Sequence, residues 1–417
     1  WYGKGHTGFK SMNHLPENKG FKGGSVLYLG GAGSYYTLVR WNGTLPMYTH
    51  RTDPDTYSTD LFGSLAVQAI LDHDPQKPFF LYLPWQAVHA PYDLPPTCQA
   101  EGGSEECPVK IRSMIHDVDL WTGKIVKALK SRGMYRNTLL VFTSDNGGTQ
   151  DGKGKEVGGN NFPLRGAKHS NWQGGMRTQT FVAGGFLPRN LHGVTHNGTF
   201  HITDWYPTFC ALAGVDGSDD SPTPPLPVDP ADPTKDIYGA NSWPPVDGKD
   251  IWAELTGSAK LDREYLWLSA QVLIKAGRYK LVTAQQDPRM TNSPPMMGWR
   301  LANGSWVDGG SLDGPGCGSA FHKREHFKPC LFDLQSDERE EHDLSEQMPE
   351  LVSEMWGELN RTQLTAYLSR SPEKLLGHCN ESCADEHWKT LYGRGISGPI
   401  CGVPSCDQPS TSPLVFV

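Results

Sequence analysis

Apolar residues recur at helical spacing in several stretches of the chain, and these stretches predict its helices. The longest runs over 109–132, where the apolar positions form one stripe that Gly133 closes. Thr203 is expected to cap a shorter helix that begins at Asp204. The helices predicted in this way are 59–72, 109–132, 204–213 and 349–369.

Short apolar runs between turn residues predict the strands. The order of strand, helix and strand between residues 78 and 143 predicts a right-handed parallel crossover. Three later runs between 265 and 283 lie close together in sequence and predict a small antiparallel sheet, with Ala276 and Gly277 in a hairpin turn, and the run 330–334 is expected to add a strand to it. Residues 1–57 show little periodicity and are expected to be loop. The predicted strands are 78–85, 138–143, 180–184, 265–269, 272–276, 278–283 and 330–334.

The run Thr138–Gly148, TLLVFTSDNGG, is the stretch around which the rest is organised. Its apolar half predicts a buried strand, and polar residues follow where the strand ends. In open α/β sheets the functional groups gather at the carboxyl ends of strands. Asp145 and Asn146 offer oxygen ligands there, which suit Ca²⁺ or Mg²⁺. An ordinary strand-to-loop turn is the alternative, because Asp-Asn-Gly-Gly is also turn chemistry.

Composition and charge exclude two classes of function. The chain has 417 residues, of which 37% are hydrophobic and 20% charged, as in globular proteins. Its net charge of −8 and the absence of a basic run argue against nucleic-acid binding. No apolar run has the length of a transmembrane helix. The chain begins at Trp1 without a methionine, and we expect it to be cut from something longer.

The cysteines and glycosylation signals favour a protein of the secretory pathway, either extracellular or lysosomal. Cys210 falls within an apolar helical pattern and is expected to be a free thiol of the core. The other cysteines lie in loop-like surroundings, as disulfides do in oxidising compartments. Those cysteines are Cys98, Cys107, Cys317, Cys330, Cys379, Cys383, Cys401 and Cys406, and the N-x-S/T sites are Asn42, Asn197, Asn303, Asn360 and Asn380.

Four other polar side chains stand out beside Asp145 and Asn146. Lys4 and His6 lie between glycines, His89 follows a predicted strand, and Lys168 lies among glycines near a tryptophan. Together they suit a tetrahedral oxyanion such as sulfate or phosphate, because ammonium groups and a metal stabilise its charge. A histidine can protonate the departing oxygen. Taken singly, His89 is better explained as a satisfied strand-end histidine and Lys168 as a surface lysine.

An ordered series of motifs makes the chain resemble the type I sulfatases, closest in pattern to the arylsulfatase B group of N-acetylgalactosamine-4-sulfatases. The resemblance covers roughly residues 1–345. Its motifs are GKGHTGF at 3–9, PENKGF at 16–21, FFLYLPWQAVHAP at 79–91, TLLVFTSDNGG at 138–148, NFPLRGAKHSNWQGGMR at 161–177, HITDWYPTFCALAG at 201–214 and LFDLQSDEREEHDL at 331–344.

The resemblance implies an α/β, alkaline-phosphatase-like fold. Its mixed, mostly parallel sheet would be flanked by helices, and a smaller C-terminal α+β domain would carry a short antiparallel sheet. The catalytic domain would span 1–263 and the smaller domain 264–370, followed by a Cys-rich tail at 371–417.

The resemblance also implies roles for the singled-out residues. Asp145 and Asn146 would bind Ca²⁺, and Lys4 and Lys168 would contact the sulfate oxygens. His6 would orient or deprotonate a formylglycine hydrate that attacks sulfur, and His89 would assist the leaving alcohol. The substrate would be a sulfated glycan or an aryl sulfate. The full-length protein would need the formylglycine-generating enzyme as a partner.

The chain departs from this family's pattern at its N-terminal side. It has no counterpart of the family's first pair of aspartate metal ligands or of its C-x-P-S-R nucleophile motif. We therefore expect an N-terminal truncation, with the nucleophile and the other calcium ligands upstream of Trp1. The chain as given would then be inactive, and an apolar strip would be exposed on its sheet. Two alternatives stay open, namely a non-catalytic sulfatase-like protein that binds sulfated glycans, and a phosphate or phosphonate ester hydrolase.

Overall fold

The structure is a computed structural model of the chain. It describes residues 1–7, 15–22, 24–28, 33–37, 40–47, 57–96, 98, 110–149, 161–168, 170–218, 246–269, 271–283, 299–300, 306–307 and 329–363. The expected tail at 371–417 and most of the Cys98–Cys107 loop lie outside these residues.

The chain divides into two compact units between Thr138 and Leu139. Among the described residues, the first unit holds Trp1–Thr138 and Gly184–Phe186, and the second holds the remainder from Leu139 onward. Each unit is described below by itself. The domain boundaries expected after residues 263 and 370 stay predictions.

The first unit contains a four-stranded sheet against which two helices pack. Its strands are β1 (Tyr2–Lys4), β2 (Val26–Tyr28), β3 (Arg40–Asn42) and β4 (Leu45–Met47), in that spatial order. β1 and β2 are parallel, whereas the other neighbouring pairs are antiparallel. The expectation that residues 1–57 form loop was therefore wrong. Strands of three residues are too short to show a hydrophobic period.

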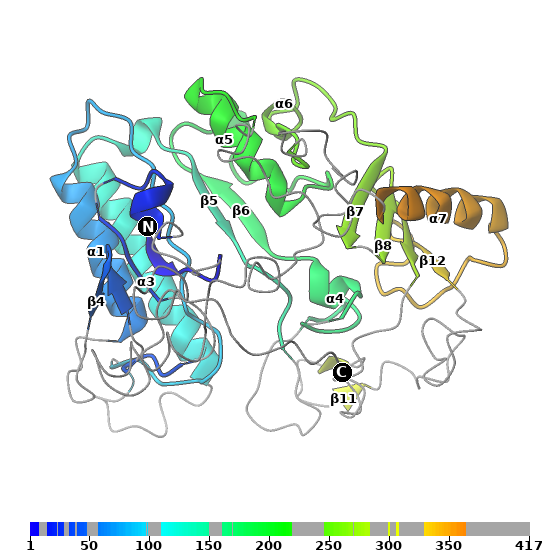
Figure 1. Cartoon of the computed structure of the whole chain (residues 1–417), viewed down its shortest axis with the longest axis horizontal. Coiled ribbons are helices and arrows are strands. Elements are labelled where there is room, and N and C mark those ends of the chain that lie inside the picture. Colours follow the sequence, from blue (N-terminus) through cyan, green and yellow to red (C-terminus); the bar gives the residue numbers. More distant parts are fainter. Residues whose placement is uncertain are drawn as a thin grey trace, which may run out of the picture. The chain divides into compact units, whose positions relative to one another are not determined.

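The two long helices of this unit lie where the periodicity predicts them. α1 (Ser58–Asp72) and α3 (Lys110–Ser131) lie side by side (Figure 1). Asp60 accepts a hydrogen bond from the Trp121 ring nitrogen at 2.7 Å, which ties one helix to the other. The predicted α3 stripe is buried at Met114, Val118, Ile125 and Leu129, but Ile115 is 52% exposed. Short 3-10 turns at Pro16–Lys19 (η2) and Tyr135–Asn137 (η4) complete the unit.

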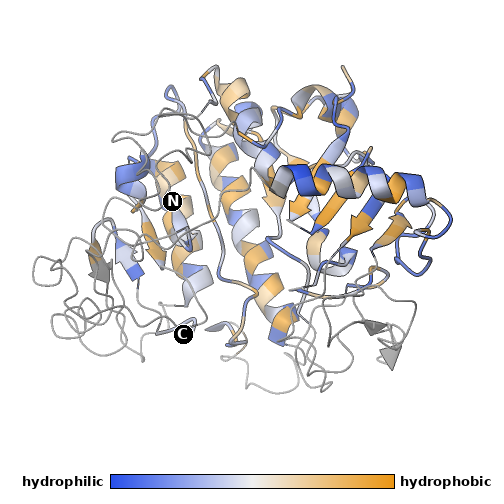
Figure 2. Cartoon of the chain, turned by 45° about the vertical axis from the view of Figure 1, so that its right-hand side comes forward, coloured by the Kyte–Doolittle hydropathy of each residue, from blue (hydrophilic) through white to orange (hydrophobic). Residues whose placement is uncertain are grey.

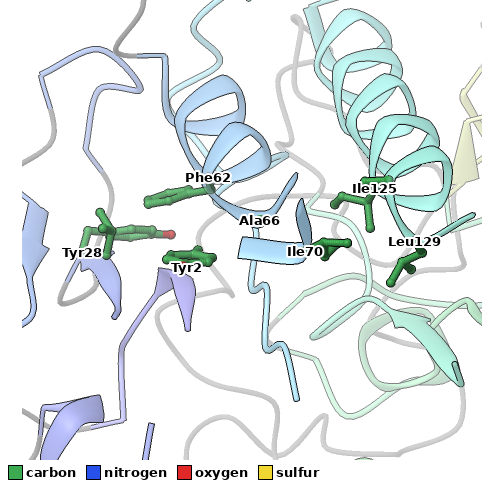
Figure 3. Packing of buried hydrophobic residues seen from close by; sticks show 9 residues of the cluster. Tyr2, Tyr28, Phe62, Ala66, Ile70, Ile125 and Leu129 are labelled. Atoms are coloured by element: carbon green, nitrogen blue, oxygen red, sulfur yellow. The ribbon is translucent and has the colours of Figure 1, made fainter. Parts of the chain in front are cut away.

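The hydrophobic core of the first unit lies between the sheet and these helices. Tyr2 and Tyr28 come from the sheet and lie beside Phe62 of α1, as Figure 3 shows. The tyrosine and phenylalanine rings of Tyr28 and Phe62 stack with their centroids 6.4 Å apart. The other buried members are Val26, Ala66, Ile70, Ile125, Ala128 and Leu129.

The apolar run 78–85 is not the buried strand that the sequence predicts. It runs parallel to β1, because the N–H groups of Tyr2 and Lys4 donate to the carbonyls of Tyr82 and Pro84 at 3.1 and 2.8 Å. Leu81, Leu83 and Trp85 pack on the core, whereas Phe80 and Tyr82 are 61% and 44% exposed. An apolar run on both faces indicates burial on both, but the described part of this unit covers one face.

The second unit begins with a two-stranded antiparallel sheet. Its strands are β5 (Leu140–Thr143) and β6 (Thr180–Ala183). β5 is half-buried, and its Phe142 ring stacks on the 49% exposed Phe181 at 4.9 Å. The expected parallel crossover was wrong among the described residues: β5 pairs with a later strand in antiparallel fashion, and 78–85 forms no strand. Phe181 is an exposed aromatic side chain on this sheet, but the N-terminal truncation from which an exposed apolar strip was expected stays a prediction.

The predicted small antiparallel sheet is confirmed in this unit. It consists of β7 (Tyr265–Ser269), β8 (Val272–Lys275), β9 (Tyr279–Val282) and β12 (Cys330–Asp333), in the order β12-β9-β8-β7. Ala276 and Gly277 both have positive φ, as the favoured type of hairpin turn requires. α7 (Pro349–Gln363) covers one face with Val352, Met355 and Leu359, and Figure 2 shows the hydrophobic strands beneath it.

Short helices and a further strand pair complete the second unit. The predicted helix at 204–213 is α5 (Trp205–Ala213), which holds the free thiol of Cys210 in a half-buried position. Thr203 does not cap it, because the 3-10 turn η6 (Ile202–Asp204) with its His201 capping box precedes α5. The others are α4 (Gln173–Met176), η5 (Arg189–Leu191), α6 (Trp252–Leu255), β10 (Trp299–Arg300) and β11 (Trp306–Val307).

Candidate active site

The second unit carries Asp145 and Asn146 directly after β5. Asp145 is exposed and Asn146 is half-buried. The Asn146 side-chain nitrogen donates to the Gly147 carbonyl at 2.8 Å, and the Ser144 hydroxyl donates to the Asn146 carbonyl at 2.9 Å. With its nitrogen held by the backbone, the Asn146 amide offers its oxygen. An exposed carboxylate and an amide oxygen at one turn are the donors that a calcium ion takes.

A glycine-rich loop, residues 161–176, is bound to this turn by backbone hydrogen bonds. The Lys168 N–H donates to the Gly148 carbonyl at 3.0 Å, and the Gly147 N–H donates to the Gly175 carbonyl at 2.9 Å. A β-carbon on Gly147 would lie 1.7 Å from the Gly174 carbonyl oxygen. Because the two backbones are in contact, Lys168 lies next to the turn that carries Asp145 and Asn146.

Asn161 fastens the loop to the turn and was missed by sequence reasoning. Its side-chain oxygen accepts from the Gly148 N–H at 2.8 Å. Its side-chain nitrogen donates to the carbonyls of Gly148 and Gly166, both at 3.0 Å. An asparagine in a glycine-rich loop is typical of a surface turn, so the residue types alone gave no signal for this role.

The first unit carries Lys4, at the end of β1, and His6 just after it. Gly3 lies against the 78–85 segment with φ of +130°, and a β-carbon there would lie 2.0 Å from the Pro84 carbonyl oxygen. Lys4 is half-buried, whereas His6 is exposed and has a positive φ of 46°. Non-glycine residues seldom adopt that conformation, and such residues cluster at functional sites.

His89 follows the same 78–85 segment. Its ring nitrogen Nδ1 lies 2.7 Å from the Ala90 carbonyl oxygen and therefore carries a proton, which leaves Nε2 for a substrate. The hydroxyl of the fully buried Tyr35 lies 2.8 Å from the His89 carbonyl and 2.9 Å from that of Gln86. Burial raises the pKa of Tyr35, so this hydroxyl stays a donor. The backbone around His89 is thus held from inside the unit.

The predicted site residues therefore form two groups in the structure. Asp145, Asn146 and Lys168 come together in the second unit, and Lys4, His6 and His89 lie in the first. The meeting of the two groups around one anion stays a prediction.

A second set of metal-ligand residue types occurs at Asp337, Glu341 and His342, whose candidate ligand atoms lie within 4.8 Å of one another. The Asp337 carboxylate accepts the N–H groups of Glu341 and His342 at 3.1 and 2.9 Å. Since the carboxylate closes its own turn and the other two side chains are exposed, this cluster is explained as turn structure.

Comparison with known proteins identifies the family. The sequence profile of the family named Sulfatase matches residues 1–215, which is more than half of the chain, and the chain therefore belongs to the sulfatase family.

Two mouse sulfatases are among its curated relatives. Arylsulfatase J of Mus musculus is 28% identical over 397 residues, which cover 89% of this chain and 61% of that protein. Steryl-sulfatase of Mus musculus is 25% identical and covers 78% of this chain and 47% of that protein. The chain thus spans about half to three-fifths of the length of these relatives.

The solved structures agree on the fold. PsFucS1 sulfatase from Pseudoalteromonas sp. superposes with a TM-score of 0.60 at 21% identity, covering 87% of this chain and 69% of that one. The fold is alkaline-phosphatase-like, with mixed sheets, flanking helices and the small antiparallel sheet β12-β9-β8-β7.

Proposed function

We propose that the protein is a sulfuric ester hydrolase of the arylsulfatase type that acts on sulfated glycans or aryl sulfates. The observation that carries the proposal is the set of backbone hydrogen bonds between the Asp145–Asn146 turn and the glycine-rich loop 161–176, called the Lys168 loop from here on. These backbone bonds hold Lys168, whose ammonium would bind an anion, next to a turn with two oxygen donors for a cation, in a chain of the sulfatase family. An arylsulfatase B-like specificity for 4-sulfated galactosamine is the finer form of the proposal.

The residues of the chain fit this chemistry. Asp145 and Asn146 would hold Ca²⁺, which supplies positive charge next to the sulfate oxygens. The ammonium groups of Lys168 and Lys4 would bind the same oxygens and stabilise the charge that develops on them. The proton on Nδ1 of His89 is fixed by the Ala90 carbonyl, so its imidazolium form donates from Nε2 to the leaving alcohol oxygen. His6 would hold the nucleophile in line.

The nucleophile itself is expected from outside this chain. Sulfatases generally use a formylglycine, made from a cysteine by the formylglycine-generating enzyme, and we propose that this enzyme is a partner of the full-length protein. Its hydrate would supply the attacking hydroxyl. On this account the 417-residue chain binds sulfate and calcium ions without turnover.

The secretory pathway, with an extracellular or lysosomal destination, is the proposed location. Cys98 and Cys330 are each disulfide-bonded, which requires an oxidising compartment. The N-x-S/T asparagines Asn42, Asn197 and Asn360 are exposed, as glycosylation demands. Among the described residues, no helix meets the length and hydropathy of a bilayer span.

An assay of sulfate release tests the proposed function. The protein is produced from its complete coding sequence in a secretory host and given an aryl sulfate and a 4-sulfated galactosaminoglycan side by side. We expect both substrates to lose sulfate, with activity removed by a calcium chelator and restored by Ca²⁺. Tight binding of the sulfated glycan without any sulfate release would favour a non-catalytic sulfatase-like protein, a reading that rests on the missing C-x-P-S-R motif.

A further inference from the structure

A buried ion pair lies outside the residues assigned so far. Lys280 of β9 and Glu340 are both fully buried, and the Lys280 ammonium donates to Glu340 Oε1 at 2.6 Å. Two charges removed from water are costly, and a buried pair can be replaced by apolar residues without loss of stability. The pair therefore calls for an explanation other than the stability of the sheet.

Glu340 also binds the Lys168 loop at two points. Its other carboxylate oxygen, Oε2, accepts the Gln173 N–H at 2.7 Å. Its backbone carbonyl accepts from the Arg165 guanidinium at 2.8 Å. Arg165 precedes Lys168 in the loop and Gln173 follows it, so Glu340 holds the loop on both sides of the lysine.

The backbone of Glu340 shows that this arrangement is imposed by its surroundings. Its φ is +56°, in the left-handed region that non-glycine residues rarely occupy. Burial lowers the pKa of Arg165, and the negative charge of Glu340 opposes that shift. The Arg165 guanidinium also lies 4.0 Å from the centroid of the Trp172 ring. Trp172 is 1% exposed and packs with Val272, Val282 and Phe332 of the small sheet.

We propose that Glu340 is a positioning residue for the reaction: it ties both sides of the Lys168 loop to β9, so that Lys168 stays beside the Asp145–Asn146 turn. This rests on the proposed function, because it assumes that Lys168 binds the anion. Glu340 itself acts through the loop and not on the substrate. Lys280 serves as the fixed counter-charge, since β9 is bonded on both sides within its sheet.

The test separates two features of Glu340: the hydrogen bonds by which it holds the Lys168 loop, called the clamp from here on, and its buried charge. In the double variant K280M/E340L two apolar side chains replace the pair, and Gln173 loses its acceptor. In K280M/E340Q the ion pair is also gone, but an amide oxygen can still accept from Gln173. R278Q is the matched control, because Arg278 forms an ion pair with Asp333 in the same sheet, and its other side-chain contact among the described residues is the Tyr279 ring. Q173P removes the N–H donor together with the buried Gln173 side-chain amide, and it leaves the ion pair intact; proline is tolerated at the first position of a helix.

Hydrogen exchange of the 417-residue chain is the primary measurement, read on peptides from residues 164–177 and, for comparison, from β8 and β9. K280M/E340L and Q173P are expected to lose at least tenfold of the amide protection in the loop while β8 and β9 keep theirs. K280M/E340Q is expected to recover most of the loop protection, and R278Q to match the native chain. Native loop protection in both K280M/E340L and Q173P would overturn the proposal.

Binding of inorganic sulfate to the same variants, measured by calorimetry, tests the purpose of the clamp. Affinity is expected to fall about tenfold in K280M/E340L and to recover in K280M/E340Q. A loosened loop with unchanged sulfate affinity would overturn the positioning role. A native chain that binds no sulfate would contradict the proposed function instead, and the exchange result would then decide the clamp alone.

Discussion

The Lys168 N–H donates to the Gly148 carbonyl at 3.0 Å, which fixes the lysine of one loop to the turn that carries Asp145 and Asn146. The side chains proposed to bind a cation and an anion are thus joined through backbone, and not through side chains that could rotate away. Such bonds keep a binding geometry fixed before the ligand arrives.

Lys168→Met tests the anion-binding role within the second unit. Removing one charge-assisted contact to an anion costs about 1.5–3 kcal/mol. Sulfate affinity, measured by calorimetry on the 417-residue chain, is therefore expected to fall at least tenfold with little change in melting temperature. Lys260→Met is the control, since Lys260 is an exposed lysine of the same unit. Equal sulfate affinity in both variants would remove Lys168 from the site.

Gly147→Ala tests the close contact between the turn and the loop. The new β-carbon would lie 1.7 Å from the Gly174 carbonyl oxygen, so the two backbones must separate. Overpacking of this kind costs about 1–3 kcal/mol, and sulfate affinity is expected to fall with stability. Urea unfolding measures the first effect and calorimetry the second.

Gly123→Ala is the control for that substitution. Gly123 lies in α3, and a β-carbon there meets nothing within 4 Å. Since alanine favours helix over glycine, this variant is expected to gain about 0.5–1 kcal/mol. A Gly147→Ala protein as stable as the native chain would show that the contact is looser than the structure has it.

Asp117→Asn tests a pH dependence within the first unit. Asp117 is 2% exposed, and burial, with the nearby Asp60 charge, raises its pKa to about 7, while Lys124 acts in the opposite direction. The folded carboxyl keeps its proton up to about pH 7, whereas the unfolded one releases it near the ordinary aspartate pKa of 3.8. The folded state therefore binds more protons between these values, and stability falls as the pH rises through this window.

The Asp117→Asn variant has no carboxyl at this position and therefore escapes the loss of stability as the pH rises. A rise from 3.8 to about 7 corresponds to about 4 kcal/mol at 1.36 kcal/mol per pKa unit. Urea unfolding at pH 8 is expected to show Asp117→Asn more stable than the native chain by about 2–4 kcal/mol, with a smaller difference at pH 5. Asp119→Asn, at an exposed position of the same helix, should show no such trend. Parallel pH profiles of native and Asp117→Asn proteins would contradict the assignment.

Much of the fold was predictable where a hydrophobic period runs long enough to be recognised. α1, α3 and the strands of the small sheet lie close to their predicted bounds, because each buries one stripe or face. β1 to β4 were missed because each has three residues and its register is set by contacts such as Tyr2 with Val26. Ile115 of α3 continues the stripe in sequence but lies at its edge, where the described residues leave it exposed.

The residue types of the candidate site were predictable from the sequence, but the residues that hold its loop in place were not. Asp145, Asn146 and Lys168 were singled out from strand ends, glycines and the family resemblance, and the structure joins them. Asn161 and Glu340 were not, since an asparagine among glycines and a glutamate in an acidic run both indicate solvated surface. Their roles depend on partners distant in sequence, such as Lys280 for Glu340, and spacing along the chain does not encode these.

The central proposal is that His89 of the first unit and Lys168 of the second both serve the hydrolysis of a sulfate ester. The direct measurement is kcat/KM for aryl sulfate hydrolysis by the protein from its complete coding sequence, with His89→Gln and Lys168→Met made separately and together. We predict a loss of at least 100-fold in each single variant, and a double variant that loses less than the product of the two, because the residues act on one transition state. Near-native activity in either single variant would contradict the account.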